Sequence, residues 1–155
     1  MMVAASDRVP SAARWLAGAG TLPFLAGAIV VATGTGDAVP AAASATAAYG
    51  AVILSFLGGI HWGFAAADHG TRRARLLGAS VLPALVGWVA LLIPQSAGLV
   101  VLAAAFAGVF VLDRIAAAEN LAPPWWLRLR APLSLAVTAM LLVTALTFDP
   151  GSAPA

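Results

Sequence analysis

The sequence lacks cysteine and lysine, and only 9% of its 155 residues are charged. Without cysteine, the chain has no disulfide, no thiolate metal site and no redox dithiol. A soluble domain carries about 25% charged residues, so this chain has too little polar surface to be surrounded by water. All eight basic residues are arginines scattered in short connections, so the net charge of +2 does not indicate a nucleic-acid-binding surface.

Sequence motifs of catalysis are also missing. The chain has no G-x-S-x-G, no H-E-x-x-H, no phosphate-binding loop and no dinucleotide fingerprint. Its two histidines, His61 and His69, fall short of a zinc site in the absence of cysteine. They also lie on or just past the same predicted helix, so they cannot sandwich a haem iron within one chain. We therefore expect no enzyme activity, no catalytic residues, no metal and no cofactor.

The chain is instead rich in long apolar runs, and 62% of its residues are hydrophobic. Five runs lie at approximately residues 15–33, 46–67, 76–93, 97–118 and 131–148. Each approaches the ~20 residues that span a ~30 Å hydrocarbon core as a helix. The runs are continuous rather than alternating, which excludes barrel strands. We predict an all-α, polytopic membrane protein in which residues 1–155 form a single membrane domain, a bundle of five transmembrane helices in the lipid bilayer.

The placement of the arginines predicts the orientation of the chain. They precede the first span and occupy the second-to-third and fourth-to-fifth connections, at Arg8, Arg14, Arg72, Arg73, Arg75, Arg114, Arg128 and Arg130. The other connections contain no basic residue, so the positive-inside rule predicts a cytoplasmic N-terminus and a periplasmic C-terminus. The first apolar run is longer than the core of a signal peptide, so we expect this span to be retained.

The connection between the fourth and fifth spans ends in the string APPWWLRLR. Pro123 and Pro124 stop the preceding helix, because a proline disfavours helical backbone in the residue before it. Tryptophan and arginine side chains near the end of a span favour the headgroup level of a membrane. We therefore predict interface anchors at Trp125, Trp126, Arg128 and Arg130. A specific lipid or partner site is the alternative.

Residues 18–27 and 78–87 resemble one another, as GAGTLPFLAG and GASVLPALVG. Each segment contains a proline, Pro23 or Pro83, that is expected to kink a helix in mid-span. Broken helices at matching places in repeated units point to a transporter site. The shared residues are common in this chain, so a chance match is the alternative to an internal repeat.

His61 is an ionisable residue inside the second apolar run. At helical spacing it shares a face with mostly small residues, namely Ala47, Gly50, Leu54, Gly58, Ala65 and Asp68. Gly59 and Gly63 form a G-x-x-x-G on the neighbouring stripe, a pattern that lets another helix approach closely. We expect the ring to hydrogen-bond to a neighbouring helix, for example to a carbonyl freed by Pro23 or Pro83.

An ionisable residue inside a membrane is by default a candidate for function. A proton relay usually needs several such groups. The spans of this chain otherwise hold few polar residues, among them Ser55, with Asp68 and Asp113 at the inner ends. We therefore favour a structural role for His61 between helices over a role in chemistry.

Several strings in the chain resemble a known family of membrane proteins. They are LPF in the first span, YGAVILSFLGGIHWGF in the second, SVLPALVGWVALL in the third and PPWWLRLRAPLS entering the fifth. From about residue 14 to residue 146, this pattern resembles the family called domain of unknown function 3429 (DUF3429). The resemblance implies a small multi-span protein of bacterial inner membranes, with mitochondrial relatives and no established activity. It also implies hallmark positions at Tyr49, Ser55, Gly58, Gly59, Trp62, Gly63, Pro83, Trp126 and Arg130.

Three hypotheses for the function follow from these observations. The leading one is a non-enzymatic protein that acts as a structural, assembly or accessory partner of a membrane complex, either with another membrane protein or as a homo-oligomer. It rests on the minimal loops, the glycine-rich faces and the missing catalytic groups. The first alternative is a small-solute or proton transporter that uses His61 and the proline-kinked helices. The second alternative is a binder of a lipophilic ligand.

Overall fold

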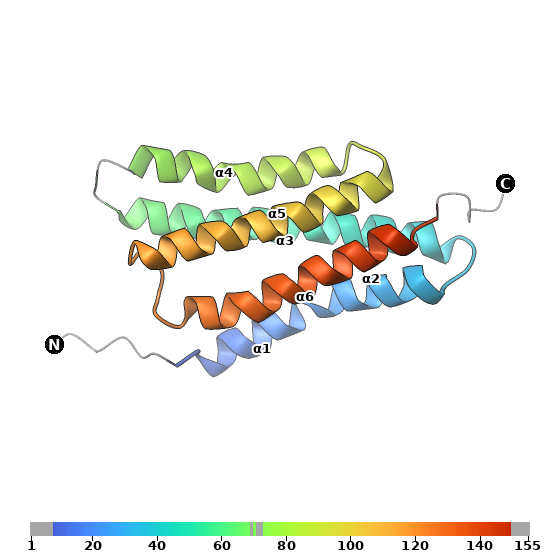
Figure 1. Cartoon of the computed structure of the whole chain (residues 1–155), viewed down its shortest axis with the longest axis horizontal. Coiled ribbons are helices and arrows are strands. Elements are labelled where there is room, and N and C mark those ends of the chain that lie inside the picture. Colours follow the sequence, from blue (N-terminus) through green and yellow to red (C-terminus); the bar gives the residue numbers. More distant parts are fainter. Residues whose placement is uncertain (1–7, 69, 71–72, 150–155) are drawn as a thin grey trace.

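The computed structural model describes residues 8–68, 70 and 73–149, so His69 and Arg72 lie outside the described residues. Within these ranges it contains six helices and no strand (Figure 1). The helices are α1 (Ser11–Ala19), α2 (Leu22–Thr33), α3 (Ala38–Ala67), α4 (Arg73–Ala90), α5 (Gln95–Ala118) and α6 (Trp126–Thr147). Because α1 and α2 together make one span, five segments are long and apolar enough to cross a membrane. The predicted all-α architecture with five spans is confirmed.

All five spans begin earlier than predicted, and the difference is largest for α3 and α6. α3 begins at Ala38 rather than near residue 46, because its first turns are dominated by alanine, the strongest helix former. Pro40 falls in the first turn of α3, where proline is tolerated. α6 begins at Trp126 rather than near residue 131, so the string WLRLR forms the start of a helix rather than the end of a connection.

The spans run side by side along the long axis of the bundle (Figure 1). They form a ring in the order α2, α3, α4, α5 and α6, which closes on α2, and α3 also packs against α5 across the middle. The core consists of large buried side chains from four of these helices, Phe24, Leu54, Leu99, Leu102, Phe106 and Leu141. α1 contributes no buried side chain and makes its main contact with α6. α1 therefore packs less against the core than the other helices do.

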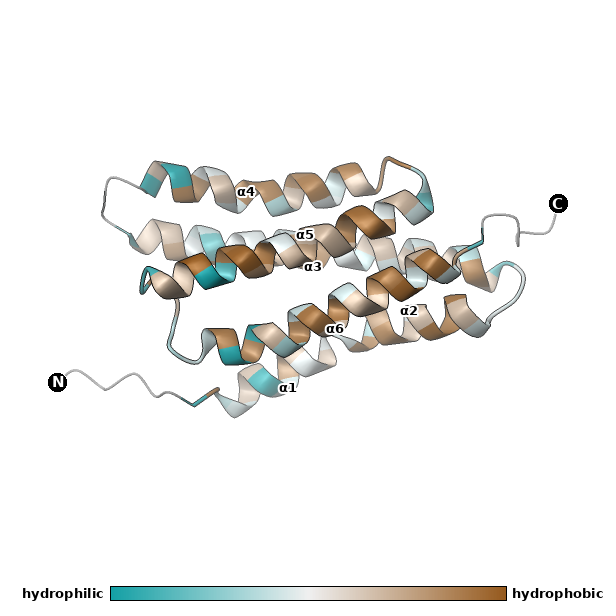
Figure 2. Ribbon diagram, viewed as in Figure 1, coloured by the Kyte–Doolittle hydropathy of each residue, from teal (hydrophilic) through white to brown (hydrophobic). Residues whose placement is uncertain are grey.

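The outer faces of the helices carry large apolar side chains. Trp15, Leu135 and Leu146 are 79%, 74% and 83% exposed. Soluble monomers rarely expose large apolar surfaces, so these faces suit contact with lipid. Figure 2 shows that most of each helix is pale to brown and that hydrophilic residues gather near one end. We call this end the arginine end, and it is formed by the starts of α1, α4 and α6 and the end of α5, with Arg14, Arg73, Arg75, Arg114, Arg128 and Arg130.

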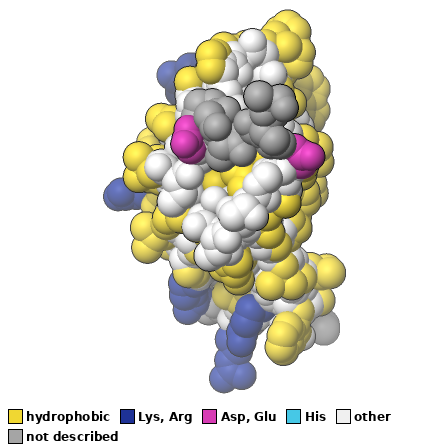
Figure 3. Space-filling model, turned by 90° about the vertical axis from the view of Figure 1, so that its right-hand side faces the viewer, with side chains coloured by type: hydrophobic (Ala, Val, Ile, Leu, Met, Phe, Trp, Pro, Cys, Tyr) yellow, Lys and Arg dark blue, Asp and Glu magenta, His cyan; other side chains and the backbone are white. Residues whose placement is uncertain are grey.

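The opposite end of the bundle carries acidic residues. Asp37 lies there before α3, and Asp149 lies there after α6. In the view onto this end, acidic side chains are bordered by hydrophobic ones, and basic side chains are visible only towards the periphery (Figure 3). Two acidic residues therefore lie opposite the arginine end, whereas Asp68 and Glu119, which follow α3 and α5, lie at the arginine end itself.

The first span is interrupted at residues 20–21, where α1 ends and α2 begins. Pro23 lies in the first turn of α2, where its missing N–H needs no partner. Tyr49, on α3, donates its hydroxyl to the carbonyl of Gly20 at 3.1 Å and so satisfies an acceptor at the interruption. Pro83, by contrast, is buried inside the continuous helix α4. The two similar segments therefore differ in conformation: the first span is interrupted just before Pro23, as expected of a proline in mid-span, whereas α4 continues through Pro83.

Gly58 is a glycine at the closest approach of α3 to α4. A Cβ atom at this position would lie 2.5 Å from the carbonyl oxygen of Ser80, much closer than ordinary contact. Gly59 and Gly63 have open space around them and face outwards. The predicted packing role of the G-x-x-x-G stripe is therefore wrong, because α3 turns the stripe of His61 inwards. That stripe is buried from residue 47 to residue 65, as its spacing predicted.

We expect Gly58→Ala to weaken the bundle, because the added methyl group must push α4 away from α3. Overpacking of a tight contact costs about 1–3 kcal/mol, which lowers the thermal unfolding midpoint by several degrees. Gly59→Ala is the matched control and should leave the midpoint unchanged or slightly raised. Thermal unfolding of the three proteins in one detergent measures the difference, and equal midpoints for both variants would contradict the assignment.

Candidate functional site

A fully buried carboxylate, that of Asp113 on α5, is the centre of a polar cluster near the arginine end. Trp126 donates its indole N–H to one carboxylate oxygen at 2.8 Å, and Arg130 donates its Nε–H to the other at 2.8 Å. Asp113 is 0% exposed and Arg130 is 7% exposed, so the ion pair is removed from water. Each charge therefore depends on the other, because an uncompensated buried charge is strongly destabilising.

His61 completes this cluster from α3. Its Nε2 lies 3.2 Å from the Asp113 oxygen that accepts the Trp126 N–H, but it is not directed for a well-formed hydrogen bond. The ring of His61 also meets Phe64 edge-on, with centroids 5.8 Å apart, and Phe64 meets Trp126 in the same way at 5.6 Å. The expected bond from this nitrogen to a carbonyl freed by Pro23 or Pro83 is thus not formed, because α3 turns the ring towards α5.

The turn between α5 and α6 brings the cluster together. Asn120 has a φ of +57°, and the backbone N–H of Leu121 donates to the carbonyl of Ala116 at 2.9 Å. This is a Schellman ending in which asparagine takes the place of the more usual glycine. The two prolines that follow prevent further helix, and the chain reverses into α6. Trp126 and Arg130, four residues apart and so on one face of α6, then lie against the buried carboxylate.

Two of the four predicted interface anchors are therefore wrong. Trp126 and Arg130 are buried and bonded to Asp113, because α6 already includes both positions and turns them inwards. Arg128 is exposed at the start of α6. Trp125 is half-buried and lines a cavity.

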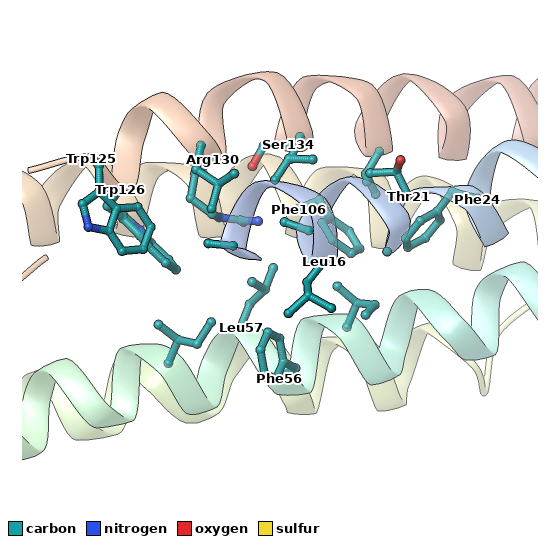
Figure 4. A pocket seen from close by; sticks show the side chains of 18 residues that line it. Leu16, Thr21, Phe24, Phe56, Leu57, Phe106, Trp125, Trp126, Arg130 and Ser134 are labelled. Atoms are coloured by element: carbon teal, nitrogen blue, oxygen red, sulfur yellow. The ribbon is translucent and has the colours of Figure 1, made fainter. Parts of the chain in front are cut away.

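That cavity, of about 330 Å³, lies between α1, α3 and α6 on the side of the bundle where α1 diverges (Figure 4). Its walls are mainly apolar and include Leu16, Phe24, Ile53, Phe56, Leu57 and Phe106. The volume falls at the lower end of the range of small-molecule sites, which is about 300–1,000 Å³. Leu16 and Phe56 are 75% and 63% exposed, so the cavity is reached from the lipid-facing side.

The polar end of the cavity is formed by α6. Nη2 of Arg130 and Oγ of Ser134 are buried and have no hydrogen-bond partner among the described residues. Both residues line the cavity, and in Figure 4 the side chain of Arg130 extends from α6 towards Phe106. Arg130 therefore joins two sites, since its Nε–H binds Asp113 and its side chain also lines the cavity. Buried polar atoms without partners are rare in native proteins, which singles out this position.

The remaining candidate residues lie apart from the cluster. Tyr49 donates its hydroxyl to the carbonyl of Gly20 at the interruption of the first span. Ser55 donates to the carbonyl of Ala51 in its own helix at 3.0 Å. Trp62 is exposed, and Asp68 lies at the end of α3. In the ranges that the structure describes, no group of three or more histidine or acidic residues is placed to hold a metal ion.

Sequence reasoning missed Ser134 and the cavity. The signal for Ser134 was its spacing of four residues from Arg130, which places both on one helical face once α6 is extended back to Trp126. The cavity has no comparable signal, because it depends on the angle between α1 and α3.

We expect Asp113→Asn and Arg130→Gln to destabilise the protein when made singly, each by about 3–5 kcal/mol, because each leaves one buried charge without its partner. The double variant removes both charges and should recover most of the loss. Titration with a denaturing detergent gives the unfolding free energy of the wild type, the two single variants and the double variant. The double-mutant cycle formed by these four values measures the coupling between the two side chains. Additive losses would show that the two side chains do not act as a pair.

The family described as "protein of unknown function (DUF3429)" matches residues 9–146. Transmembrane protein 69 of Xenopus tropicalis is 36% identical over 132 residues, which cover 81% of this chain and 50% of that protein. The chain thus spans about half the length of this relative, and no solved structure matches it. Since the family match covers nearly all of the chain and every residue of the polar cluster, the protein belongs to the DUF3429 family.

Proposed function

We propose that this protein binds a lipophilic molecule in the cavity between α1, α3 and α6. The observation that carries the proposal is the side chain of Arg130, which lines an otherwise mainly apolar cavity and whose Nη2 is a buried donor without a partner within the described ranges. A buried donor without a partner is unfavourable by about 1–3 kcal/mol, and a bound molecule with an acceptor would remove this penalty. Apolar walls with a few placed polar groups are the usual composition of a small-molecule site.

Access to the cavity supports a ligand that is dissolved in the bilayer. The exposed residues at its edge, Leu16 and Phe56, lie on the apolar outer face of the bundle. A molecule that partitions into lipid reaches this edge without crossing the ring of helices. The interruption of the first span supports the same role, because the divergence of α1 leaves the space between α1 and α3.

The proposal includes the orientation of the chain and its location in a membrane. The arginines gather at one end of the bundle, which supports a cytoplasmic N-terminus and a periplasmic C-terminus by the positive-inside rule. Membership of the family supports a membrane location, which we propose to be the bacterial inner membrane. We propose a non-enzymatic role, because the cavity presents donors and apolar walls rather than a nucleophile with a base.

The other two hypotheses have less support from the geometry. An accessory role in a complex is compatible with the apolar outer faces, but lipid alone accounts for those faces equally well. A proton carrier needs His61 to exchange protons along a path, whereas the ring is enclosed between an ion-paired carboxylate and aromatic side chains. Ligand binding has the stronger support, because two residues with unpartnered polar atoms, Arg130 and Ser134, line a cavity of small-molecule size.

Filling the cavity should abolish ligand binding. Ala17 lines the cavity from α1, whereas Ala19 lies on the same helix, is exposed and does not line it. Native mass spectrometry of protein extracted gently from its own membrane should show a bound lipophile on the wild type and on Ala19→Phe, and none on Ala17→Phe. Equal occupancy of all three proteins would contradict a ligand in this cavity.

His61→Gln separates binding from transport. Glutamine keeps a donor near Asp113, so we expect the variant to fold and to retain the bound lipophile. A transporter that uses the imidazole would lose its proton or solute flux in the same variant while still folding. Flux measured in proteoliposomes, alongside ligand occupancy, distinguishes the two outcomes.

A further inference from the structure

The two unpartnered polar groups of the cavity lie next to one another on α6. Arg130 and Ser134 are four residues apart, so they share one face of the helix about one turn apart. Arg130 is 7% exposed and Ser134 is 4% exposed, so neither is satisfied by bulk water. The guanidinium can only donate, and the serine hydroxyl can donate as well as accept. Together they place two unpartnered polar side chains in the wall of the cavity.

The charge at this end of the cavity is already balanced. The Nε–H of Arg130 is bound to the carboxylate of Asp113 at 2.8 Å, and Asp113 is fully buried. Arg130 is the only charged residue that lines the cavity among those the structure describes. An anionic ligand would add a second negative charge to the same guanidinium, where water cannot screen it. A neutral acceptor receives the N–H without adding a charge.

The shape of the cavity indicates where the acceptor group and the apolar part of such a ligand lie. Leu57, Phe106 and Val137 line the cavity beside the polar end, and Leu16 and Phe56 line it at its exposed edge. The acceptor therefore lies at the buried end, near Arg130, and the apolar part extends towards the lipid. The position of Arg130 in the second turn of α6 puts this end close to the arginine end of the bundle.

On the basis of the proposed function, we infer that the ligand is a neutral lipophile whose carbonyl oxygen accepts hydrogen bonds from Nη2 of Arg130 and Oγ of Ser134. Asp113 is a positioning residue, because it holds the guanidinium and neutralises its charge without touching the ligand. A lipophilic ketone or quinone has this chemistry, and so does the ester carbonyl of a bilayer glycerolipid.

The test uses three probes of equal chain length in nanodiscs made from ether-linked phospholipids, which have no ester carbonyl. The probes are 2-dodecanone, dodecane and dodecanoate, the last at a pH that keeps it ionised. Native mass spectrometry gives the probe concentration at which half of the protein carries one probe. We expect 2-dodecanone to reach half-occupancy at about a tenfold lower concentration than dodecane, as a hydrogen bond from a charged donor predicts. Dodecanoate should bind more weakly than the ketone.

Ser134→Ala tests the contact without removing a buried charge. It should reduce the preference for 2-dodecanone over dodecane by about threefold or more and leave dodecane unchanged. The matched control is Ser55→Ala, because Ser55 is an exposed serine that bonds to its own helix and does not line the cavity. The control should keep the full preference for the ketone.

The possible outcomes distinguish an error in the inferred carbonyl contact from an error in the proposed binding cavity. If 2-dodecanone and dodecane bind equally, and both are lost in Ala17→Phe, the cavity binds ligands but the inferred carbonyl contact is wrong. If dodecanoate binds most tightly, the ligand is an anion and the inference of a neutral head group is overturned. If no probe distinguishes the wild type from Ala17→Phe, the proposed function fails as well.

Replacing the ether lipids by ester lipids identifies the natural source of the carbonyl. If the bilayer glycerolipid is the ligand, ester lipids should compete and raise the concentration of 2-dodecanone needed for half-occupancy. If a separate ketone or quinone is the ligand, the change of lipid should have no effect. Both results support the carbonyl contact, and they differ only in the molecule that supplies it.

Discussion

The structure depends on one constraint, a fully buried carboxylate inside a bundle that suits a membrane. Asp113 has no access to water, so the protein must supply its counter-charge and its hydrogen bonds. These come from Trp126 and Arg130 on α6, with His61 of α3 close by. Meeting this need requires α5 to end sharply and α6 to begin early, and it places one helical face of α6 against α5. The same face of α6 also lines the cavity, so the ion pair with Asp113 fixes the orientation of the Arg130 guanidinium there.

A second feature acts together with this one, the interruption of the first span. If residues 11–33 formed one straight helix, α1 would continue along the ring of helices beside α3. Instead the helix breaks, and Tyr49 satisfies the carbonyl of Gly20 at the break. α2 keeps its place in the core through Phe24, while α1 diverges. The cavity lies between α1, which has no buried side chain, and the core helices α3 and α6.

The sequence predicted features that depend on periodicity within one helix, and it failed where two helices meet. The buried stripe of α3 followed from its spacing of small residues and is confirmed. Trp126 and Arg130 were assigned to the membrane interface, because tryptophan and arginine beside the end of an apolar run have the same pattern whether they face water or a buried acid. Asp113 showed no sign of its partners, since they lie thirteen and seventeen residues further on, across a turn. Gly58 and Gly59 are neighbours in the same motif, and only the angle of α4 distinguishes them.

The loose attachment of α1 has a consequence for selectivity. Two walls of the cavity belong to the well-packed helices α3 and α6, and the third belongs to a helix with no buried side chain. Tilting α1 about residues 20–21 changes the width of the cavity without disturbing the core or the ion pair. For the ligand that we propose, this arrangement predicts strict selection of the end that meets Arg130 and tolerance of the bulk of the remainder.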